Sequence, residues 1–366
     1  MKFSTTRVNS SELNEDNYVS TENMLQDYQG VMEAKSVPED VNVISFSCGD
    51  ILISNIRPYL KKVWKATFNG GCSSDVFVLK ANNNIESDYL HYVIANDKFI
   101  NFVMSGAKGV KMPRGDKNQM KTYSLSLPQI QEQKKIGKML SLLDERIVTQ
   151  NKIIDKLQSL IKGLNDSLYA QYGGKVLTSF AELGTSYSGL SGKSAQDFGS
   201  GKPFITYLNV YSNNVINENE FQYVAIKDDE KQNFAEYGDV LFTLSSETPE
   251  EVGIGSVYLG KEKVYLNSFC FGIHITNAAI AFPPYLSYYV SSTAFRKFIY
   301  PYAQGSTRFN LCKADFEKAR IKLPTLENQK RIYSILSHID NKIITERQML
   351  DLYNSQKQYL LRQMFI

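Results

Sequence analysis

The chain has 366 residues, 43% of them hydrophobic and 22% charged, which is typical of a globular protein with two or three domains. Its net charge of +3 does not by itself indicate a nucleic-acid partner. The four cysteines have no CxxC spacing and no stretch reaches the ~18 apolar residues of a membrane helix, which argues against a metal centre and a membrane protein. The N-terminus lacks the apolar run of a signal peptide, so we expect a cytoplasmic protein.

Residues 1–126 are predicted to form a first globular domain of mixed helix and strand. β-rich runs such as DVFVLK (75–80) are separated by turn signals such as Asn69-Gly70-Gly71. Positive charge is concentrated in two stretches, because residues 51–74 contain no acid and residues 98–121 contain one, Asp116. A solvated charged surface is the common alternative, but cations on glycine-rich loops can follow DNA phosphates. We predict DNA contact by Arg57, Lys61, Lys62, Lys65, Lys108, Lys111, Arg114 and Lys117.

Residues 127–171 are predicted to form a long helical spacer. Leu127-Pro128 marks its boundary, because the residue before a proline avoids helical angles. Apolar residues then recur at alternating steps of four and three, which is a heptad seam, and some 36 residues of helix would make a rod of ~55 Å. The predicted seam has one polar position, Gln150, and consists of Ile136, Leu140, Leu143, Ile147, Gln150, Ile154 and Leu157.

Residues 172–322 are predicted to form a second globular domain that weakly repeats the first. GDILIS (49–54) is echoed by GDVLFT (238–243), and a glycine-containing loop beginning at Gly106 is echoed by one beginning at Gly305. Residues 176–194 have no counterpart before Met1, so we expect the first domain either to be shorter at its N-terminus or to have an entry that is built differently.

Uncharged donors and acceptors are frequent in this second domain. Asn can form a bidentate pair with adenine, and Arg with guanine, although such residues are also common at ordinary surfaces. Gly192-Lys193-Ser194 lacks the earlier glycine of a phosphate-binding loop, since Tyr187 stands there. The candidate DNA-binding residues are Ser186, Tyr187, Lys193, Tyr207, Asn209, Thr307, Arg308 and Asn310.

Residues 323–366 repeat the first helical segment without a gap, 196 residues later. Each helix could pack only on its own domain, but the regular seam favours a helix partner, in a parallel or an antiparallel arrangement. The seam of this second spacer consists of Ile332, Leu336, Ile339, Ile343, Glu346, Leu350 and Tyr353. The chain contains no GxSxG, HExxH, paired CxxC or GxGxxG motif, so we expect no catalytic residue and no metal ligand.

The repeated helical segments resemble a conserved region of a known family. Leu127-Pro128, EQKKI (132–136), Leu140-Ser141 and Asp144 are similar to the helical region of the specificity subunit of type I restriction–modification enzymes. The second copy departs from the pattern with Asn328 before Gln329. YVSTENM (18–24) and GDIL (49–52) are similar to segments of the family's target recognition domains.

The resemblance implies an α+β chain in which two target recognition domains are separated by two helices packed as an antiparallel coiled coil. Each domain would read one half of a bipartite, asymmetric DNA site. The helices would set the spacer and dock two adenine methyltransferase subunits that use S-adenosylmethionine, and two restriction subunits that use ATP and Mg²⁺ can join. The chain itself would carry no cofactor, in the cytoplasm of a bacterium or archaeon. The alternative is a non-catalytic adaptor whose coiled helices assemble protein partners.

Overall fold

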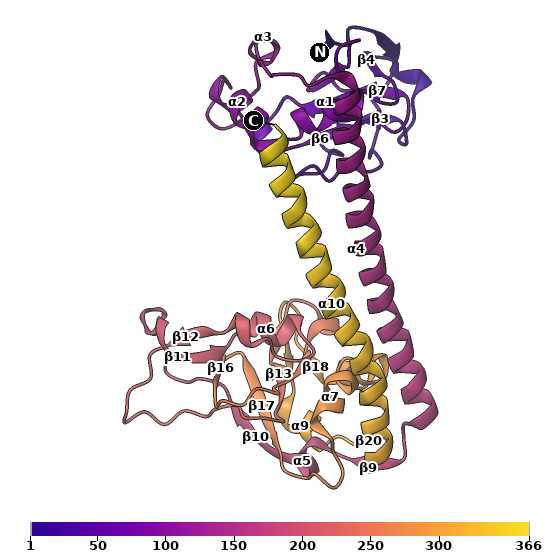
Figure 1. Ribbon diagram of the computed structural model, residues 1–366. Helices are drawn as coiled ribbons and strands as arrows, with labels where there is room; N and C mark the ends of the chain where they lie inside the picture. The colour runs from indigo at the N-terminus through magenta and orange to yellow at the C-terminus, as the bar shows by residue number, and fades with distance from the viewer. Residues whose placement is uncertain (1, 366) are drawn as a thin grey trace. The chain divides into compact units, whose positions relative to one another are not determined.

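The computed structural model describes residues 2–365 and divides into two compact units. The first unit comprises residues up to Lys152 together with those from Gln348 onward, and the second comprises Ile153–Arg347. Each unit combines a mixed α/β body with one segment from each of two long helices (Figure 1).

The first unit contains two four-stranded sheets. The central sheet is antiparallel throughout, in the order β1 (Lys2–Phe3), β8 (Val76–Lys80), β5 (Ile51–Ser54), β6 (Val63–Lys65). The second sheet has the order β2 (Arg7–Asn9), β4 (Asn42–Phe46), β7 (Gly70–Cys72), β3 (Tyr18–Val19), with its last pair parallel. Among the described residues of this unit, three short α-helices complete the body: α1 (Ser87–Ile94), α2 (Asp97–Ser105) and α3 (Lys117–Lys121).

The second unit is built around a matching antiparallel sheet, in the order β10 (Gly184–Ser188), β17 (Cys270–Ile275), β13 (Val240–Thr243), β15 (Gly255–Val257). The unit has three smaller sheets as well. One has the order β12 (Gln222–Val224), β11 (Phe198–Ile205), β16 (Tyr265–Leu266), and another has the order β14 (Ser245–Ser246), β19 (Phe309–Leu311), β18 (Ala303–Gln304). The third is the pair of β20 (Ile321–Leu323) and β9 (Val176–Thr178). Its short helices are α5 (Phe180–Leu183), α6 (Tyr207–Ser212), α7 (Pro283–Tyr289), α8 (Thr293–Ile299) and α9 (Lys313–Lys318).

The two bodies differ at their entry. In the first unit β1 pairs with β8 as β10 pairs with β17 in the second, but β1 is shorter. The second unit adds the antiparallel pair of β9 and β20, which leads into the second long helix. Among the described residues of the first unit, 123–129 form no strand at the corresponding place.

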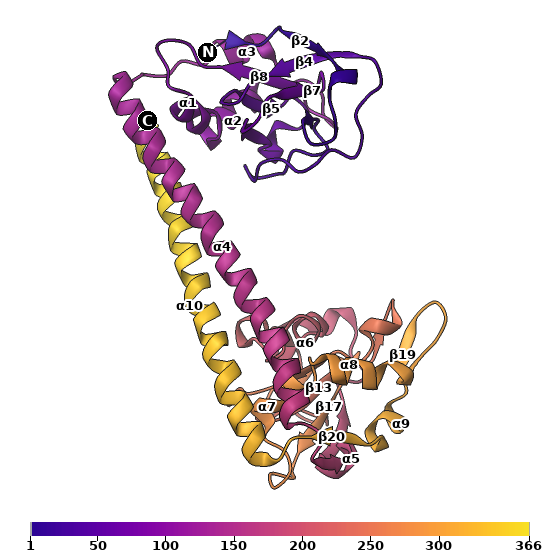
Figure 2. The same ribbon diagram turned by 90° about the vertical axis from the view of Figure 1, so that its right-hand side faces the viewer.

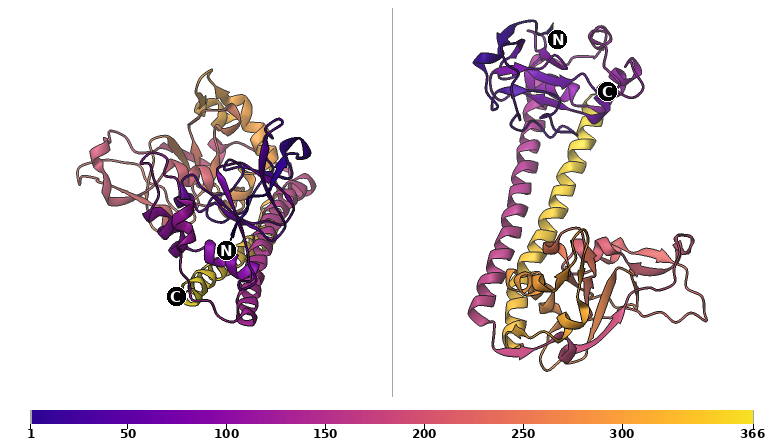
Figure 3. Two further views of the ribbon diagram at one scale, coloured as in Figure 1. Left: turned by 90° about the horizontal axis from the view of Figure 1, so that it is seen from above. Right: turned by 180° about the vertical axis from the view of Figure 1, so that it is seen from behind.

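The two predicted long helices are α4 (Ile130–Tyr172) and α10 (Leu326–Met364). Every predicted seam residue is buried or half-buried, as a heptad seam requires. In the first unit the N-terminal part of α4 lies beside the C-terminal part of α10, where Lys357 Nζ is 2.6 Å from Asp144 Oδ1. In the second unit the C-terminal part of α4 and the N-terminal part of α10 belong to one apolar core, which contains Leu168 and Leu336. The helices therefore run antiparallel and lie side by side within each unit (Figure 2 and the right-hand view of Figure 3).

Each long helix also packs on the body that precedes it in the chain. Gln133, only 1% exposed, accepts a hydrogen bond from the backbone of Glu86 (2.9 Å) and donates to the carbonyls of Asn84 (3.1 Å) and Pro128 (2.9 Å). The Tyr92 hydroxyl donates to Asp144 over 2.8 Å. The helix is thus joined to its body by polar contacts as well as by apolar packing.

The second unit repeats these contacts at positions displaced by 196 residues. Gln329 is fully buried, accepts from the backbone N–H of Phe282 (2.8 Å) and donates to the carbonyls of Ile280 (2.7 Å) and Pro324 (3.0 Å). Tyr288 likewise donates to Asp340. The helix partner is therefore confirmed, and the alternative that each helix packs only on its own body is wrong, because each helix packs on its own body and on the other helix.

Candidate nucleic-acid interface

Each unit carries a short hairpin, and the two hairpins are separated by the same 196 residues as the two long helices. In the first unit, Lys108 and Arg114 exchange backbone hydrogen bonds of 3.0 and 2.9 Å. In the second unit, Gln304 and Asn310 are opposed in the same way, as members of β18 and β19. We call residues 108–114 the first hairpin and residues 304–310 the second hairpin; the loop beside β19 projects from the body of the second unit (Figure 2).

A glycine opens both turns. Gly109 has φ +98° and Gly305 has φ +144°, values that favour glycine because a side chain would clash with the backbone. The structural counterpart of Gly305 is therefore Gly109, and the sequence-based match of Gly305 to Gly106 is wrong by three residues.

The segment that follows β5 in the first unit, or β13 in the second, holds the hairpin of that unit in place. In the first unit Ile56 is paired with Arg114, and the backbone N–H of Arg57 donates to the carbonyl of Pro113 over 2.8 Å. In the second unit Ser245 of β14 takes the place of Ile56 and is paired with Asn310. The structure therefore brings Arg57 from the first predicted basic stretch against the hairpin of the second stretch.

The first hairpin is exposed and positively charged. The side chains of Lys108 and Arg114 are 84% and 51% exposed, and Lys111 is exposed at the tip. Arg114 Nη1 lies 2.9 Å from Asp75 Oδ1. Backbone N–H groups of α3, with Lys108, hold the pKa of Asp116 below its usual range, so this carboxylate stays charged beside the hairpin.

The other predicted cations of the first unit have partners inside the fold. Lys61 pairs with Asp97 over 2.8 Å, and Lys65 pairs with Asp88. Lys62 Nζ donates to the carbonyl of Thr21 over 2.6 Å, and Lys117 Nζ lies 4.8 Å from the ring centre of Phe3. All four lysines are half-buried, whereas Lys108, Lys111 and Arg114 of the first hairpin are exposed.

In the second unit, Thr307, Arg308 and Asn310 are exposed on the second hairpin. Tyr207, at the start of α6, is half-buried and donates its hydroxyl to the carbonyl of Ser245 over 2.8 Å, which positions the strand beside the hairpin. Ser186 is half-buried in β10, opposite Ile273 of β17.

Two further candidates lie in the interior of the second unit. Asn209 has no exposed surface and closes a loop, donating to the carbonyl of Asn217 (2.9 Å) and accepting from its N–H (3.0 Å). Tyr187, 7% exposed, donates its hydroxyl to Asp239 (2.7 Å), and burial raises the pKa of both groups. Since neither side chain can reach a ligand at the surface, direct base contact is the wrong interpretation of both.

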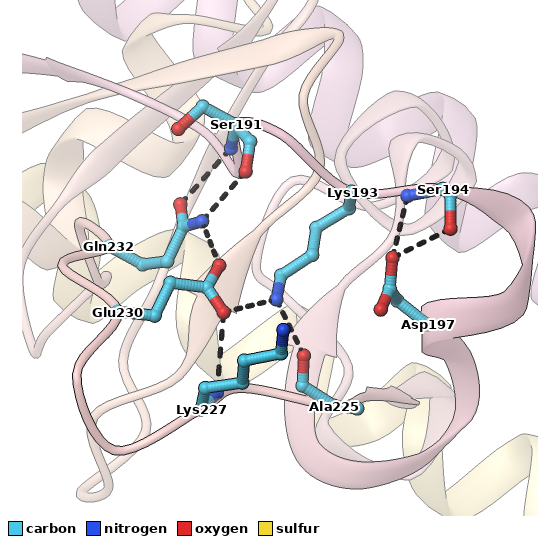
Figure 4. Close-up of polar contacts among 8 residues, drawn as sticks. All are labelled: Ser191, Lys193, Ser194, Asp197, Ala225, Lys227, Glu230 and Gln232. Carbon is cyan, nitrogen blue, oxygen red and sulfur yellow. Dashed lines mark hydrogen bonds and ion pairs between the residues drawn. The ribbon is translucent and has the colours of Figure 1, made fainter.

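Lys193 belongs to a closed polar network (Figure 4). Its side chain is 7% exposed, its Nζ bonds to Glu230 and donates to the carbonyl of Ala225 over 2.7 Å, and Gln232 bonds Glu230 from the other side. These contacts lower the pKa of Glu230 to about 2. Lys193 therefore fixes the loop around Glu230 and presents no free charge to a phosphate.

Lys193→Ala is expected to lower the melting temperature by several degrees, because Glu230 loses its partner. The DNA affinity of the assembled complex should stay unchanged. Calorimetry and DNA titration measure the two effects, and Lys231→Ala, an exposed lysine in the same loop, is the control. Weaker DNA binding at an unchanged melting temperature would return Lys193 to the interface.

Among residues 2–365, no group of three or more His, Cys, Asp or Glu side chains could hold a metal ion. Within the same residues, no helix is both long enough and apolar enough to span a membrane.

Comparison with known proteins identifies the fold. The family model described as "Type I restriction modification DNA specificity domain" matches residues 4–159 and 186–352, one match in each half of the chain. The chain belongs to this family. The matches cover most of the sequence and confirm the resemblance noted from the repeated helical segments.

Curated specificity subunits are similar to this chain in sequence. The putative type I restriction enzyme MjaX specificity subunit of Methanocaldococcus jannaschii is 28% identical over 347 residues, which covers 84% of this chain and 76% of that protein. The type I restriction enzyme EcoDI specificity subunit of Escherichia coli is 26% identical over 126 residues, covering 34% and 28% of the two chains.

Solved structures confirm the predicted fold class. The HsdS subunit from Thermoanaerobacter tengcongensis is 18% identical, with a TM-score of 0.50 and coverage of 100% of this chain and 94% of that one. A chain from a study of the assembly and conformational transition of the type I R-M system is 18% identical, with a TM-score of 0.60 and coverage of 99% and 94%. At these identities the likeness concerns the fold.

Proposed function

We propose that this chain is the non-catalytic, sequence-specific DNA-recognition subunit of a type I restriction–modification complex. Each unit would read one half of a bipartite, asymmetric site. The observation that carries the proposal is the pair of hairpins in one repeat register with unlike exposed side chains. Unlike hairpins on matched scaffolds are what two unlike half-sites require.

The antiparallel helices would set the spacer between the half-sites and dock two methyltransferase subunits. Exposed apolar residues recur at matched positions of the two helices, as Met139 and Ile335, and as Val148 and Ile344. Two equivalent apolar surfaces suit two copies of one partner. Family membership favours this function over that of an adaptor whose bodies bind only protein.

The remaining chemistry would belong to the partners. The methyltransferase subunits would use S-adenosylmethionine to modify adenine, and two restriction subunits using ATP and Mg²⁺ would complete the nuclease. This chain would hold none of these cofactors and would act in the cytoplasm, where DNA and partner subunits are available.

Methylation mapping of the host DNA tests the proposal. With the gene present, we expect one methylated motif made of two short half-sequences separated by an unread spacer, and without the gene that motif should disappear. The reconstituted methyltransferase complex should also bind DNA with an affinity that falls steeply with salt. An unchanged set of methylated motifs after deletion of the gene would contradict the proposal.

A further inference from the structure

The second hairpin places three polar side chains in one row. β19 is the middle strand of its sheet, and Asn310 lies directly opposite Gln304 of β18 on one side and Ser245 of β14 on the other. Directly opposed residues of antiparallel strands point to the same face of a sheet. Ser245, Asn310 and Gln304 therefore form a row, which we call the second row; Asn310 and Gln304 are exposed in it.

The first hairpin builds the same row from different residues. Arg114 lies opposite Lys108 on one side and Ile56 on the other. Lys108 and Arg114 precede Gln304 and Asn310 by the 196 residues that relate the two long helices. Ile56, Arg114 and Lys108 are the first row. The central position of both rows is exposed, and backbone pairing fixes it from two sides.

We propose that the central position of each row reads one base in the major groove: Arg114 a guanine in the first half-site, and Asn310 an adenine in the second. This inference rests on the proposed function and deepens it. Arg forms a bidentate pair with O6 and N7 of guanine, and Asn forms one with N6 and N7 of adenine. The neighbouring residues agree in chemistry, because Lys108 also suits guanine and Gln304 also suits adenine.

The surroundings of Arg114 fit a reading role. Asp75 holds Nη1 at 2.9 Å, and the carbonyl of Asp75 accepts from the backbone N–H of Asn55 over 2.7 Å, so the backbone that carries this carboxylate is itself held in place. A guanidinium has five donors, so it can keep this ion pair while a free edge meets a base. An oriented side chain loses less entropy on binding than a mobile one.

The tips of the hairpins suit a different task. Lys111 of the first hairpin and Arg308 of the second are exposed cations that lie in the turns, outside the paired strands. Cations of this kind contact phosphates, which position a protein on DNA without reading sequence. The rows and the tips therefore predict separable effects on specificity and on affinity.

The reciprocal variants Arg114→Asn and Asn310→Arg test the proposal in the assembled methyltransferase complex. Methylation mapping should show one base of the first half-site, other than the methylated adenine, changing from guanine to adenine in Arg114→Asn. In Asn310→Arg, one base of the second half-site should change from adenine to guanine. Each preference should shift by about 10- to 100-fold, with the other half-site unaltered.

Tip variants provide the matched control. Lys111→Asn and Arg308→Asn should slow methylation of every site about equally and leave the motif unchanged. Row variants that methylate the original motif with unaltered base preference would overturn the inference, and the proposed function would stand. If the wild-type complex has no bipartite motif, the proposed function itself fails.

A second measurement uses the unaltered protein, in case a row variant does not fold. Duplexes carry 7-deazaguanine or 7-deazaadenine, which lack the N7 acceptor, at one position of the motif at a time. Binding should weaken about 10-fold at one guanine of the first half-site and at one adenine of the second. Unchanged affinity at every substituted guanine of the first half-site would overturn the assignment of Arg114, and the same result at every adenine of the second would overturn that of Asn310.

Discussion

The double variant Lys108→Ala/Lys111→Ala is expected to weaken DNA binding by about 10- to 100-fold at physiological salt. Both lysines are exposed on the first hairpin, and each neutralised phosphate contributes about 0.9 to the slope of log affinity against log salt. The slope should therefore fall by about one when both are removed, because Lys111 lies at the tip that contacts phosphate, whereas Lys108 belongs to the first row. Titration of the reconstituted complex with a duplex at several salt concentrations measures both quantities.

The control removes the same charge elsewhere. Lys35 and Lys261 are exposed and lie outside both hairpins, so Lys35→Ala/Lys261→Ala should change affinity and slope far less. Thermal unfolding should be unaffected in either double variant, because surface substitutions of this kind change stability little. An equal loss of affinity in the two double variants would show that the lysines of the first hairpin do not contact DNA.

Gln133→Ala and Gln329→Ala are each expected to lower the free energy of unfolding by about 2–4 kcal/mol. Each glutamine is buried where a long helix meets its body, and its removal leaves one backbone N–H and two carbonyls without their partner. Denaturant unfolding followed by circular dichroism measures the change.

Exposed glutamines on the same helices are matched controls. Gln131→Ala on α4 and Gln348→Ala on α10 should stay within about 0.5 kcal/mol of the wild type. Equal destabilisation by the buried and the exposed substitutions would contradict the role assigned to the buried pair. The two buried substitutions lie in different units and share no hydrogen-bond partner, so their effects should add.

The long helices could be predicted because a heptad pattern reports directly on burial. Leu140, Leu143 and Ile154 in α4, and Leu336 and Ile343 in α10, are all buried where the spacing placed them. The direction of packing could not be derived from spacing alone, since well over a hundred residues separate the helices; it came from the family resemblance.

The candidate interface was harder to predict, because a sequence shows a charge but not its partner. Lys65 pairs with Asp88 and Lys193 with Glu230, which are distant in sequence. Asn209 looked like a free donor and acceptor, yet both groups of its amide are used inside the fold. Burial of a polar side chain in a short loop leaves no periodic pattern in the sequence.

One signal could have located the hairpins earlier. The displacement of 196 residues that aligns the helices also aligns Lys108 with Gln304 and Arg114 with Asn310. Extending that register into the globular domains, in place of matching Gly106 with Gly305, would have placed Gly109 and Gly305 at the same turn. The rows themselves required the structure, because they depend on which strands pair.

The spacing of the two half-sites decides whether one chain reads both of them at a fixed separation. The reconstituted complex is titrated with duplexes that carry the methylated motif with its spacer intact, or lengthened by five base pairs, about half a helical turn. We expect the lengthened duplex to bind no more tightly than a duplex with a single half-site. Equal affinity for the intact and the lengthened spacer would contradict this expectation.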